Sequence, residues 1–151
     1  MHVLLTAGPT YEPLDPVRFL GNRSTGKMGY ALAEAFAAQG ADVTLVSGPS
    51  SLPDPSNPRI RTVRVETAAE MFAAASAVAD AADVWVFAAA VADYRPAHVA
   101  SEKIKKSGET LTLELVKNVD IAATLGQRKR PEQFAVGFAL ETTNEPGPRP
   151  G

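Results

Sequence analysis

Apolar residues along this chain gather in short runs, and polar segments that often contain Gly or Pro separate one run from the next. Runs of Val, Leu, Ile and aromatic residues between such breakers are typical of β-strands. They predict strands over residues 3–8, 41–47, 59–65, 83–91, 110–115 and 134–140. The run over 83–91 is the most apolar, so we expect it in the centre of a sheet. The near alternation over 59–65 indicates a strand with one wetter face.

Other segments have the spacing of amphipathic helices. Apolar residues recur at helical intervals over 28–40, which predicts a first helix that ends at a glycine. Thr67 and Glu70 have the spacing of a capping box, and this predicts a second, alanine-rich helix to about residue 82. A third and shorter helix is expected over 120–127, capped by an aspartate.

Strands that alternate with helices predict an α/β fold: a mostly parallel, Rossmann-like sheet with helices on both faces, in three layers. We expect residues 1–144 to form this single domain and residues 145–151 to form a disordered or linker-like tail. Ligands of such sheets bind beyond the carboxyl ends of the strands, near the point where the strand order reverses. The loops over 8–23 and 90–106, and the segment after 140, are therefore the expected places for function.

Composition narrows the class of protein. The 151 residues are 45% hydrophobic and 21% charged, as in one compact soluble domain. With no cysteine there is no disulfide framework, thiol nucleophile or zinc knuckle, and two histidines are too few for a histidine-built metal site. A net charge of −2 argues against a nucleic-acid partner. The apolar runs are shorter than the ~18 residues of a membrane span and no leader peptide is recognised, so we expect a cytoplasmic protein.

The start of the predicted first helix is the richest segment in candidate chemistry. Free backbone N–H groups and the positive end of the helix dipole make such a turn an anion site. Ser24 adds a hydroxyl, and Gly26 and Gly29 let the backbone approach a phosphate closely. The alternative interpretation is an ordinary helix start with glycines that serve packing.

One common nucleotide-binding pattern is excluded and a second is disfavoured. Gly21, Gly26 and Lys27 have the spacing of a P-loop, but Met28 follows where Mg²⁺ needs Ser or Thr, and the preceding strand ends too early. No G-x-G-x-x-G follows the first strand, and no Tyr-x3-Lys pair is present, so a nicotinamide-dependent oxidoreductase is disfavoured.

Three further segments have candidate chemistry beside plain alternatives. Asp93 follows the central strand and could bind a hydroxyl or Mg²⁺, or be an ordinary loop residue. Lys103, Lys105 and Lys106 could close over a polyphosphate, or form a solvated loop. Asp120 could serve only as a helix cap, and Phe138 is by default a core aromatic. Together these segments favour a nucleotide site, but composition and spacing do not name the reaction.

The motifs, in order and with matching spacing, resemble those of phosphopantothenoylcysteine synthetases. In the bacterial form this enzyme is usually the carboxyl-terminal half of a bifunctional coenzyme A biosynthesis protein, and the resemblance runs from Val3 to about Asn144. The segments that carry it are Gly8 to Arg18, Asn22 to Gly29, Ala90 to Arg95, Lys103 to Lys106 and Lys117 to Ile121.

This resemblance implies a ligation in two steps. The carboxylate of 4′-phosphopantothenate attacks the α-phosphate of CTP, which gives an acyl-cytidylate and pyrophosphate. The amine of free cysteine then displaces CMP and forms an amide. Mg²⁺ is the implied metal, and a homodimer and a flavin-dependent phosphopantothenoylcysteine decarboxylase are the implied protein partners. CTP is not distinguished from ATP by the sequence.

The resemblance also implies roles for particular residues. The nucleotide would contact Gly8, Ser24, Gly26, Gly29, Lys117, Asp120 and Phe138. Phosphopantothenate and the acyl-nucleotide would contact Asn22, Ala89, Ala90 and Asp93, with Arg18 reaching in from a second subunit. Lys103 would serve the first step at the triphosphate, and Asn22 would stabilise the intermediate in both steps.

Two departures from the family pattern bear on activity. Pro9 stands where the family usually has glycine, which removes one backbone N–H donor. The family continues past Asn144 through another strand and an Asn-containing nucleotide contact, whereas the residues from Pro146 resemble neither. A non-catalytic ligand-binding remnant is therefore the alternative to the ligase, although Asn22 and Lys103 favour the enzyme.

Overall fold

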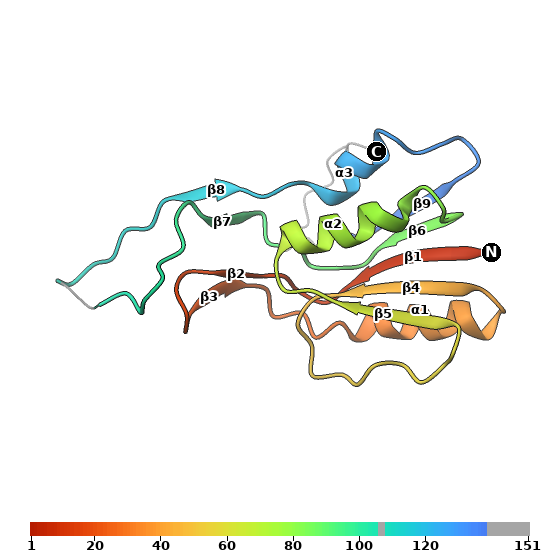
Figure 1. Ribbon diagram of the computed structural model, residues 1–151, viewed down its shortest axis with the longest axis horizontal. Helices are drawn as coiled ribbons and strands as arrows, with labels where there is room; N and C mark the ends of the chain where they lie inside the picture. Colours follow the sequence, from red (N-terminus) through yellow and green to blue (C-terminus); the bar gives the residue numbers. More distant parts are fainter. Residues whose placement is uncertain (106–107, 139–151) are drawn as a thin grey trace, which may run out of the picture.

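The computed structural model of the chain describes residues 1–105 and 108–138, and its centre is a five-stranded sheet in which every pair of neighbours is parallel. Across the sheet the order is β5-β4-β1-β6-β9 (Figure 1). These strands are β1 (His2–Ala7), β4 (Asp42–Ser47), β5 (Ile60–Arg64), β6 (Val84–Phe87) and β9 (Phe134–Gly137). β1 and β4 are almost entirely buried, as the apolar runs predict.

Helices cover both faces of this sheet. On one face, α1 (Lys27–Ala38) packs Tyr30 and Ala33 against Val3 and Leu5 of β1. On the other face lie α2 (Ala68–Ala79) and α3 (Ile121–Gly126), which pack on alternate residues of the same strands, among them Leu4. Because side chains alternate across a strand, β1 contributes to both cores. The predicted three-layered, Rossmann-like α/β fold is confirmed.

The strand order reverses between β1 and β6. From β1 the chain passes through α1 to β4 on one side, whereas β6 lies against the other side of β1. The carboxyl ends of β1 and β6 are therefore neighbours at the switch point where ligands bind in such sheets.

Two short antiparallel ribbons extend from that edge and are found where the sequence predicts mainly loops (Figure 1). One pairs β2 (Tyr11–Pro13) with β3 (Phe19–Gly21), and the other pairs β7 (Tyr94–Pro96) with β8 (Leu115–Lys117). We call residues 11–21 and 94–117, as far as they are described, the arm.

A buried carboxylate ties the arm to the domain. Glu12 Oε2 accepts a 3.0 Å hydrogen bond from the backbone N–H of Ala68, the first residue of α2, and Tyr11 N–H donates to Glu66 O at 2.8 Å. A negative charge at a helix N-terminus is favourable. The base of the arm is therefore fixed against α2.

Three strands are shorter in the structure than the sequence predicts. Residues 110–114 alternate like a strand, but β8 begins only at Leu115, because its partner β7 is three residues long. β6 ends at Phe87, and of the residues predicted to extend it to 91 only Ala90 forms a bridge. β9 ends at Gly137, and residues 139–140 and the predicted tail over 145–151 lie outside the described residues.

The three helices are found where they are predicted, although α2 ends at Ala79 and not near residue 82. The capping box of α2 is present: Thr67 Oγ1 accepts from Glu70 N–H at 3.1 Å, and Glu70 Oε1 accepts from Thr67 N–H at 3.0 Å. Asp120 caps α3, as expected. Among the described residues no helix has the length and apolar character needed to cross a membrane.

Candidate functional site

The first turn of α1 lies against the end of β1. Gly8 and Gly26 have φ angles of 77° and 83°, in the left-handed region that favours glycine. A Cβ on residue 26 would lie 3.4 Å from Gly8 Cα, and a Cβ on residue 29 would overlap the Cβ of Ala7. Gly26 and Gly29 therefore do serve packing, and the same close approach brings the helix start to the switch point.

The N-terminus of α1 keeps backbone donors available. No side chain caps the helix, and its first turn has no acidic residue. Ser24 N–H donates to Asn22 Oδ1 at 3.0 Å, and Gly26 N–H donates to Ser24 Oγ at 3.3 Å, so these residues order the approach to the helix. Within the described part of the chain, the N–H groups of Met28 and Gly29 have no hydrogen-bond acceptor. This arrangement suits an anion.

The segment after β6 joins this helix start to the other face of the sheet. Ala88 N–H donates to Thr6 O at 3.0 Å, and Ala90 N–H donates to Gly8 O at 2.8 Å. Pro9 and Ala90 form an isolated parallel bridge. Ala89 and Ala90, two of the predicted site residues, therefore lie beside Gly8 at the switch point.

A cavity of about 530 Å³ opens on the α3 side of this bridge. It lies among the ends of β6, β8 and β9 and the start of α3. Five of the predicted site residues line it: Ala89, Asp93, Lys117, Asp120 and Phe138. Phe138 is half exposed here, so the default expectation of a core aromatic is wrong for the described chain. The cavity combines an aromatic ring, small residues and charges of both signs, which suits a ligand that has both apolar and charged groups.

Two polar residues without a predicted role shape the turn that presents Asp93. Thr10 is fully buried, and its Oγ1 accepts from Ala92 N–H at 2.9 Å. Asn118 donates from Nδ2 to Ala92 O at 2.7 Å and from its backbone N–H to Asp93 O at 2.8 Å. Both residues belong to the motifs that carry the family resemblance, and this is the signal that could have identified them.

Asp120 has the structural role that the plain alternative predicts. Its Oδ1 accepts from Ala123 N–H at 3.0 Å and caps α3. The described residues contain no group of three His, Cys, Asp or Glu side chains placed to hold a metal. Asp93 and Asp120 nevertheless line one cavity, and Mg²⁺ is commonly held by one or two carboxylates together with substrate phosphates. The donor set therefore fits an ion that arrives with a nucleotide.

The remaining predicted residues lie apart from this cavity. Arg18 and Lys103 both line a second cavity, of about 810 Å³, in the arm, and neither lines the first. Asn22 is exposed between β3 and α1 and lines neither cavity. The structure thus brings Arg18 and Lys103 together, but it does not bring them to Asp93 within one chain.

Asp15 is buried beside Arg18, and its ionisation is strongly favoured. The Arg18 guanidinium, with the backbone N–H of Ile104, holds the pKa of the Asp15 carboxyl well below its usual range. Burial opposes this shift but is the smaller effect. The carboxylate is therefore charged throughout the neutral and mildly acidic range.

Comparison with known proteins shows which family this chain resembles. The family described as DNA/pantothenate metabolism flavoprotein C-terminal domain matches residues 1–147. The coenzyme A biosynthesis bifunctional protein CoaBC of Escherichia coli is 52% identical over 147 residues, which cover 95% of this chain and 36% of that protein. CoaBC of Bacillus subtilis is 52% identical over 141 residues, which cover 93% and 34%. The chain thus spans about a third of the length of these curated relatives.

Solved structures agree in fold. A crystal structure of the C-terminal domain of CoaBC has a TM-score of 0.81 at 47% identity, and the match covers 95% of this chain and 66% of that one. A Cab2 mutant in complex with phosphopantothenate-cysteine has a TM-score of 0.75 at 20% identity, with coverages of 95% and 65%, and so shares the fold.

Proposed function

This chain belongs to the family of DNA/pantothenate metabolism flavoprotein C-terminal domains, and on that premise we propose that it acts as the phosphopantothenate–cysteine ligase of coenzyme A biosynthesis. In the first step a carboxylate oxygen of 4′-phosphopantothenate bonds to the α-phosphorus of CTP, and the bond to pyrophosphate breaks. In the second step the cysteine amine bonds to the acyl carbon, CMP leaves with the electron pair, and the amine loses a proton.

The observation that carries this proposal is the switch point itself. On one side of the Gly8–Ala90 contact is a helix start with N–H donors that have no acceptor among the described residues, and on the other is a cavity lined by Asp93 and Lys117. A carboxylate becomes reactive when the attacked phosphate is held in place and its charge is neutralised. A site with phosphate donors on one side and a cavity of about 530 Å³ on the other is suited to holding both reactants.

The residue roles that we propose are those implied by the resemblance to phosphopantothenoylcysteine synthetases. We assign the nucleotide to Gly8, Ser24, Gly26 and Gly29, where the end of β1 meets the start of α1, and to Lys117, Asp120 and Phe138 in the cavity. We assign phosphopantothenate and the acyl-nucleotide to Asn22, Ala89, Ala90 and Asp93. Mg²⁺ would be held by Asp93 or Asp120 with the nucleotide phosphates, and it would neutralise phosphate charge.

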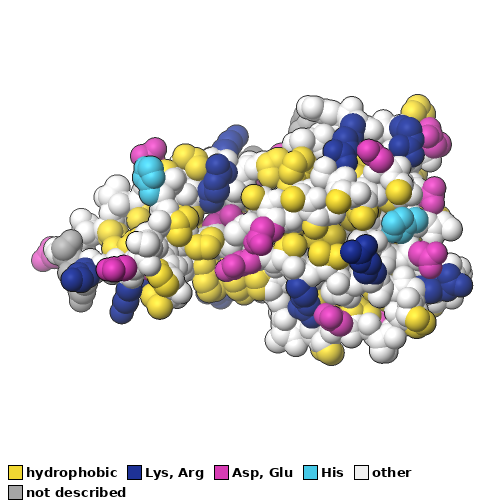
Figure 2. Space-filling model, viewed as in Figure 1, with side chains coloured by type: hydrophobic (Ala, Val, Ile, Leu, Met, Phe, Trp, Pro, Cys, Tyr) yellow, Lys and Arg dark blue, Asp and Glu magenta, His cyan; other side chains and the backbone are white. Residues whose placement is uncertain are grey.

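The proposed enzyme is a homodimer with composite sites. Arg18 lies in the arm and not beside Asp93, so its proposed contact with phosphopantothenate needs the arm of a second subunit. Lys103 lines the same cavity as Arg18 and would reach the triphosphate from that same arm. Figure 2 shows apolar side chains along the arm, and Val17, Phe19 and Leu111 are among those exposed. Burial of these side chains against a partner would be favourable.

The product and the cellular setting complete the proposal. The amide product, phosphopantothenoylcysteine, is the substrate that a flavin-dependent decarboxylase would consume, and we propose such an enzyme as the functional partner. Because the relatives are named for coenzyme A biosynthesis, we place the reaction in the cytoplasm.

Pyrophosphate release from CTP tests this function. We expect release that depends on 4′-phosphopantothenate, CMP formation only after cysteine is added, and slower turnover with ATP. Lys103→Gln should suppress release without changing the fold, whereas Lys129→Gln, at an exposed lysine beside α3, should not. No release from folded protein that binds CTP would support the non-catalytic remnant instead. Folded protein that does not bind CTP would refute the nucleotide site.

A further inference from the structure

Asp15 is a buried carboxylate of the arm to which the proposed reaction gives no role. The residue is 4% exposed, and its side chain has no exposed surface. It accepts five hydrogen bonds, from Val17 N, Arg18 N, Arg18 Nε, Arg18 Nη2 and Ile104 N. A buried charge with this many donors is fully compensated, unlike an exposed surface ion pair.

The two carboxylate oxygens of Asp15 have different partners. Oδ1 accepts from the backbone N–H groups of Val17 and Arg18 at 2.9 and 2.8 Å and so closes the turn. Oδ2 accepts from Arg18 Nε at 3.1 Å, Arg18 Nη2 at 2.7 Å and Ile104 N at 3.0 Å. One oxygen therefore shapes the local turn, and the other binds a guanidinium and a distant loop.

That distant loop contains Lys103. The Ile104 N–H is held by Asp15, and Ile104 O accepts from Arg18 Nη2 at 2.9 Å. Nearby, Ala100 N–H donates to Leu14 O at 3.0 Å. Both polar backbone groups of the residue next to Lys103 are therefore fixed to the Asp15–Arg18 pair.

We propose that Asp15 is a positioning residue of the ligase, because one carboxylate oxygen fixes both the Arg18 guanidinium and the backbone beside Lys103. The guanidinium keeps Nη1, for which no hydrogen bond is found within the described chain, to meet an anionic ligand. The proposal depends on the roles given to Arg18 and Lys103 under the proposed function. The hydrogen bonds that join Asp15 and Arg18 to Ile104 do not depend on those roles.

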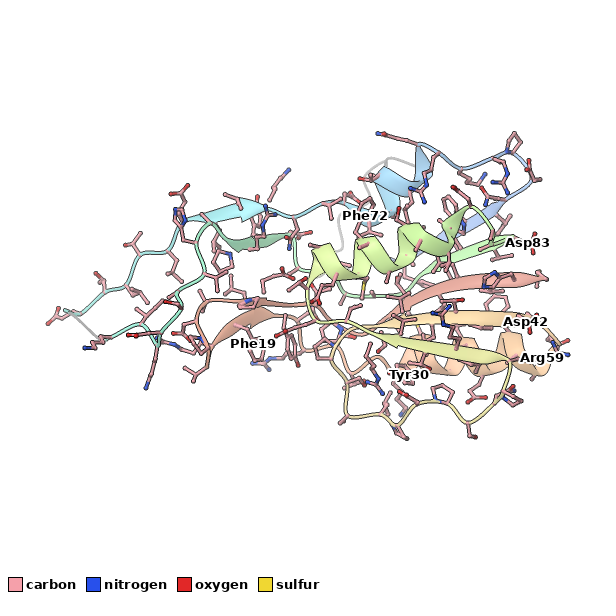
Figure 3. All side chains as sticks on the ribbon, viewed as in Figure 1. Phe19, Tyr30, Asp42, Arg59, Phe72 and Asp83 are labelled. Atoms are coloured by element: carbon pink, nitrogen blue, oxygen red, sulfur yellow. The ribbon has the colours of Figure 1, made fainter. Side chains whose placement is uncertain are left out.

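Asp15→Asn distinguishes the contacts of Asp15 with its own turn from its contacts with Arg18 and Ile104. The remaining amide oxygen can still accept from the turn, but the new NH₂ group faces the donors of Arg18 and Ile104 and accepts nothing from them. Asp42→Asn is the matched control: Asp42 pairs with Arg59 at 3.2 Å, is exposed, and lies at the opposite end of the molecule from the arm (Figure 3).

The first measurement is hydrogen exchange of the Ile104 amide in the full chain. Asp15→Asn should speed this exchange at least tenfold, and Asp42→Asn should leave it unchanged. Arg18→Gln removes the contact to Ile104 O and should also speed exchange, so it provides the same test if Asp15→Asn fails to fold. Unchanged Ile104 exchange in Asp15→Asn would overturn the proposal.

The second measurement is steady-state ligation. We expect Asp15→Asn to lower kcat/KM for 4′-phosphopantothenate by about 10- to 100-fold, because misplacement of binding groups by about 1 Å has effects of this size. In the double variant Asp15→Asn/Arg18→Gln, the fold-loss in kcat/KM should be smaller than the product of the two single fold-losses. A positioning role would be contradicted if Asp15→Asn kept the wild-type kcat/KM. It would also be contradicted if the fold-loss of the double variant equalled the product of the two single fold-losses. If the unaltered chain releases no pyrophosphate, the proposed function fails, and the exchange result alone decides whether Asp15 holds the loop.

Discussion

Residues at the start of α1 contribute through different physical causes. Gly26 is required by a left-handed φ, whereas Gly29 is required by space, since a Cβ there would overlap Ala7. Both requirements follow from the close contact between α1 and β1, and the same contact brings the helix N–H groups to the switch point. Structural and functional demands on these residues therefore coincide.

Gly29→Ala should lower the free energy of unfolding by about 1–3 kcal/mol, because the added methyl overpacks the contact between α1 and β1. Urea unfolding followed by circular dichroism measures this change. Gly126→Ala is the control, since a Cβ at that helical position would have no atom within 4 Å apart from its chain neighbours and the backbone of its own helix. If both variants show equal stability to the wild type, the close contact is absent in solution.

Asn22→Asp places a negative charge where a neutral amide is proposed to stabilise the acyl-cytidylate. We expect slower amide formation or accumulation of the intermediate, which rapid quench and separation of the nucleotides would detect. Asn57→Asp is matched to it, because Asn57 Oδ1 also accepts from the N–H two residues on, at 2.9 Å against 3.0 Å for Asn22. Ligation by Asn22→Asp at the wild-type rate would remove Asn22 from the mechanism.

At the scale of elements, α2 is where local and tertiary interactions meet. Its capping box satisfies N–H groups at its own start, while Glu12 from the arm accepts from Ala68 N–H. A two-stranded ribbon of three-residue strands is marginal by itself. The ribbon of β2 and β3 therefore depends on this anchor to the helix.

Thr67→Ala should lower the free energy of unfolding by about 1 kcal/mol, because the N-cap acceptor for Glu70 N–H is lost. Chemical denaturation measures this loss. Thr112→Ala, at an exposed position of the arm outside any strand, should change stability by less than about 0.5 kcal/mol. A loss in Thr112→Ala as large as that in Thr67→Ala would argue against a specific capping contribution.

At the scale of the whole molecule, the proposed residues are divided between the sheet edge and the arm. Asp93 and Lys117 line one cavity, whereas Arg18 and Lys103 line another. A second copy of the chain is the simplest way to bring the two sets together. The arm has exposed apolar side chains to contact such a copy.

Leu111→Asp should shift the chain from dimer to monomer, because it places a charge at an arm residue that is 60% exposed. Light scattering after size-exclusion chromatography, at several protein concentrations, measures the mass. Phe134→Asp changes an equally exposed apolar residue, 66% exposed, on β9 at the sheet edge and should leave the mass unchanged. A monomeric wild-type chain that is active would rule out composite sites.

The amino-acid sequence alone is enough to predict the elements that depend on near neighbours. The capping box at Thr67, the apolar runs of β1 and β4, and the helix that begins near Met28 need only local periodicity and short-range hydrogen bonds. The candidate residues at the strand ends could also be predicted, because parallel sheets place ligands there, and five of them line one cavity.

The arm and the partners of its residues could be identified only from the folded chain. Strands of three residues leave too little periodicity to be distinguished from loops. The alternation over 110–115 predicts a strand there, but no partner strand extends along residues 110–114. Asp15 and Ile104 are 89 residues apart, and so no local pattern encodes their contact. Such contacts exist only after the chain has folded, which is why a role for Asp15 could be proposed from the structure and not from the sequence.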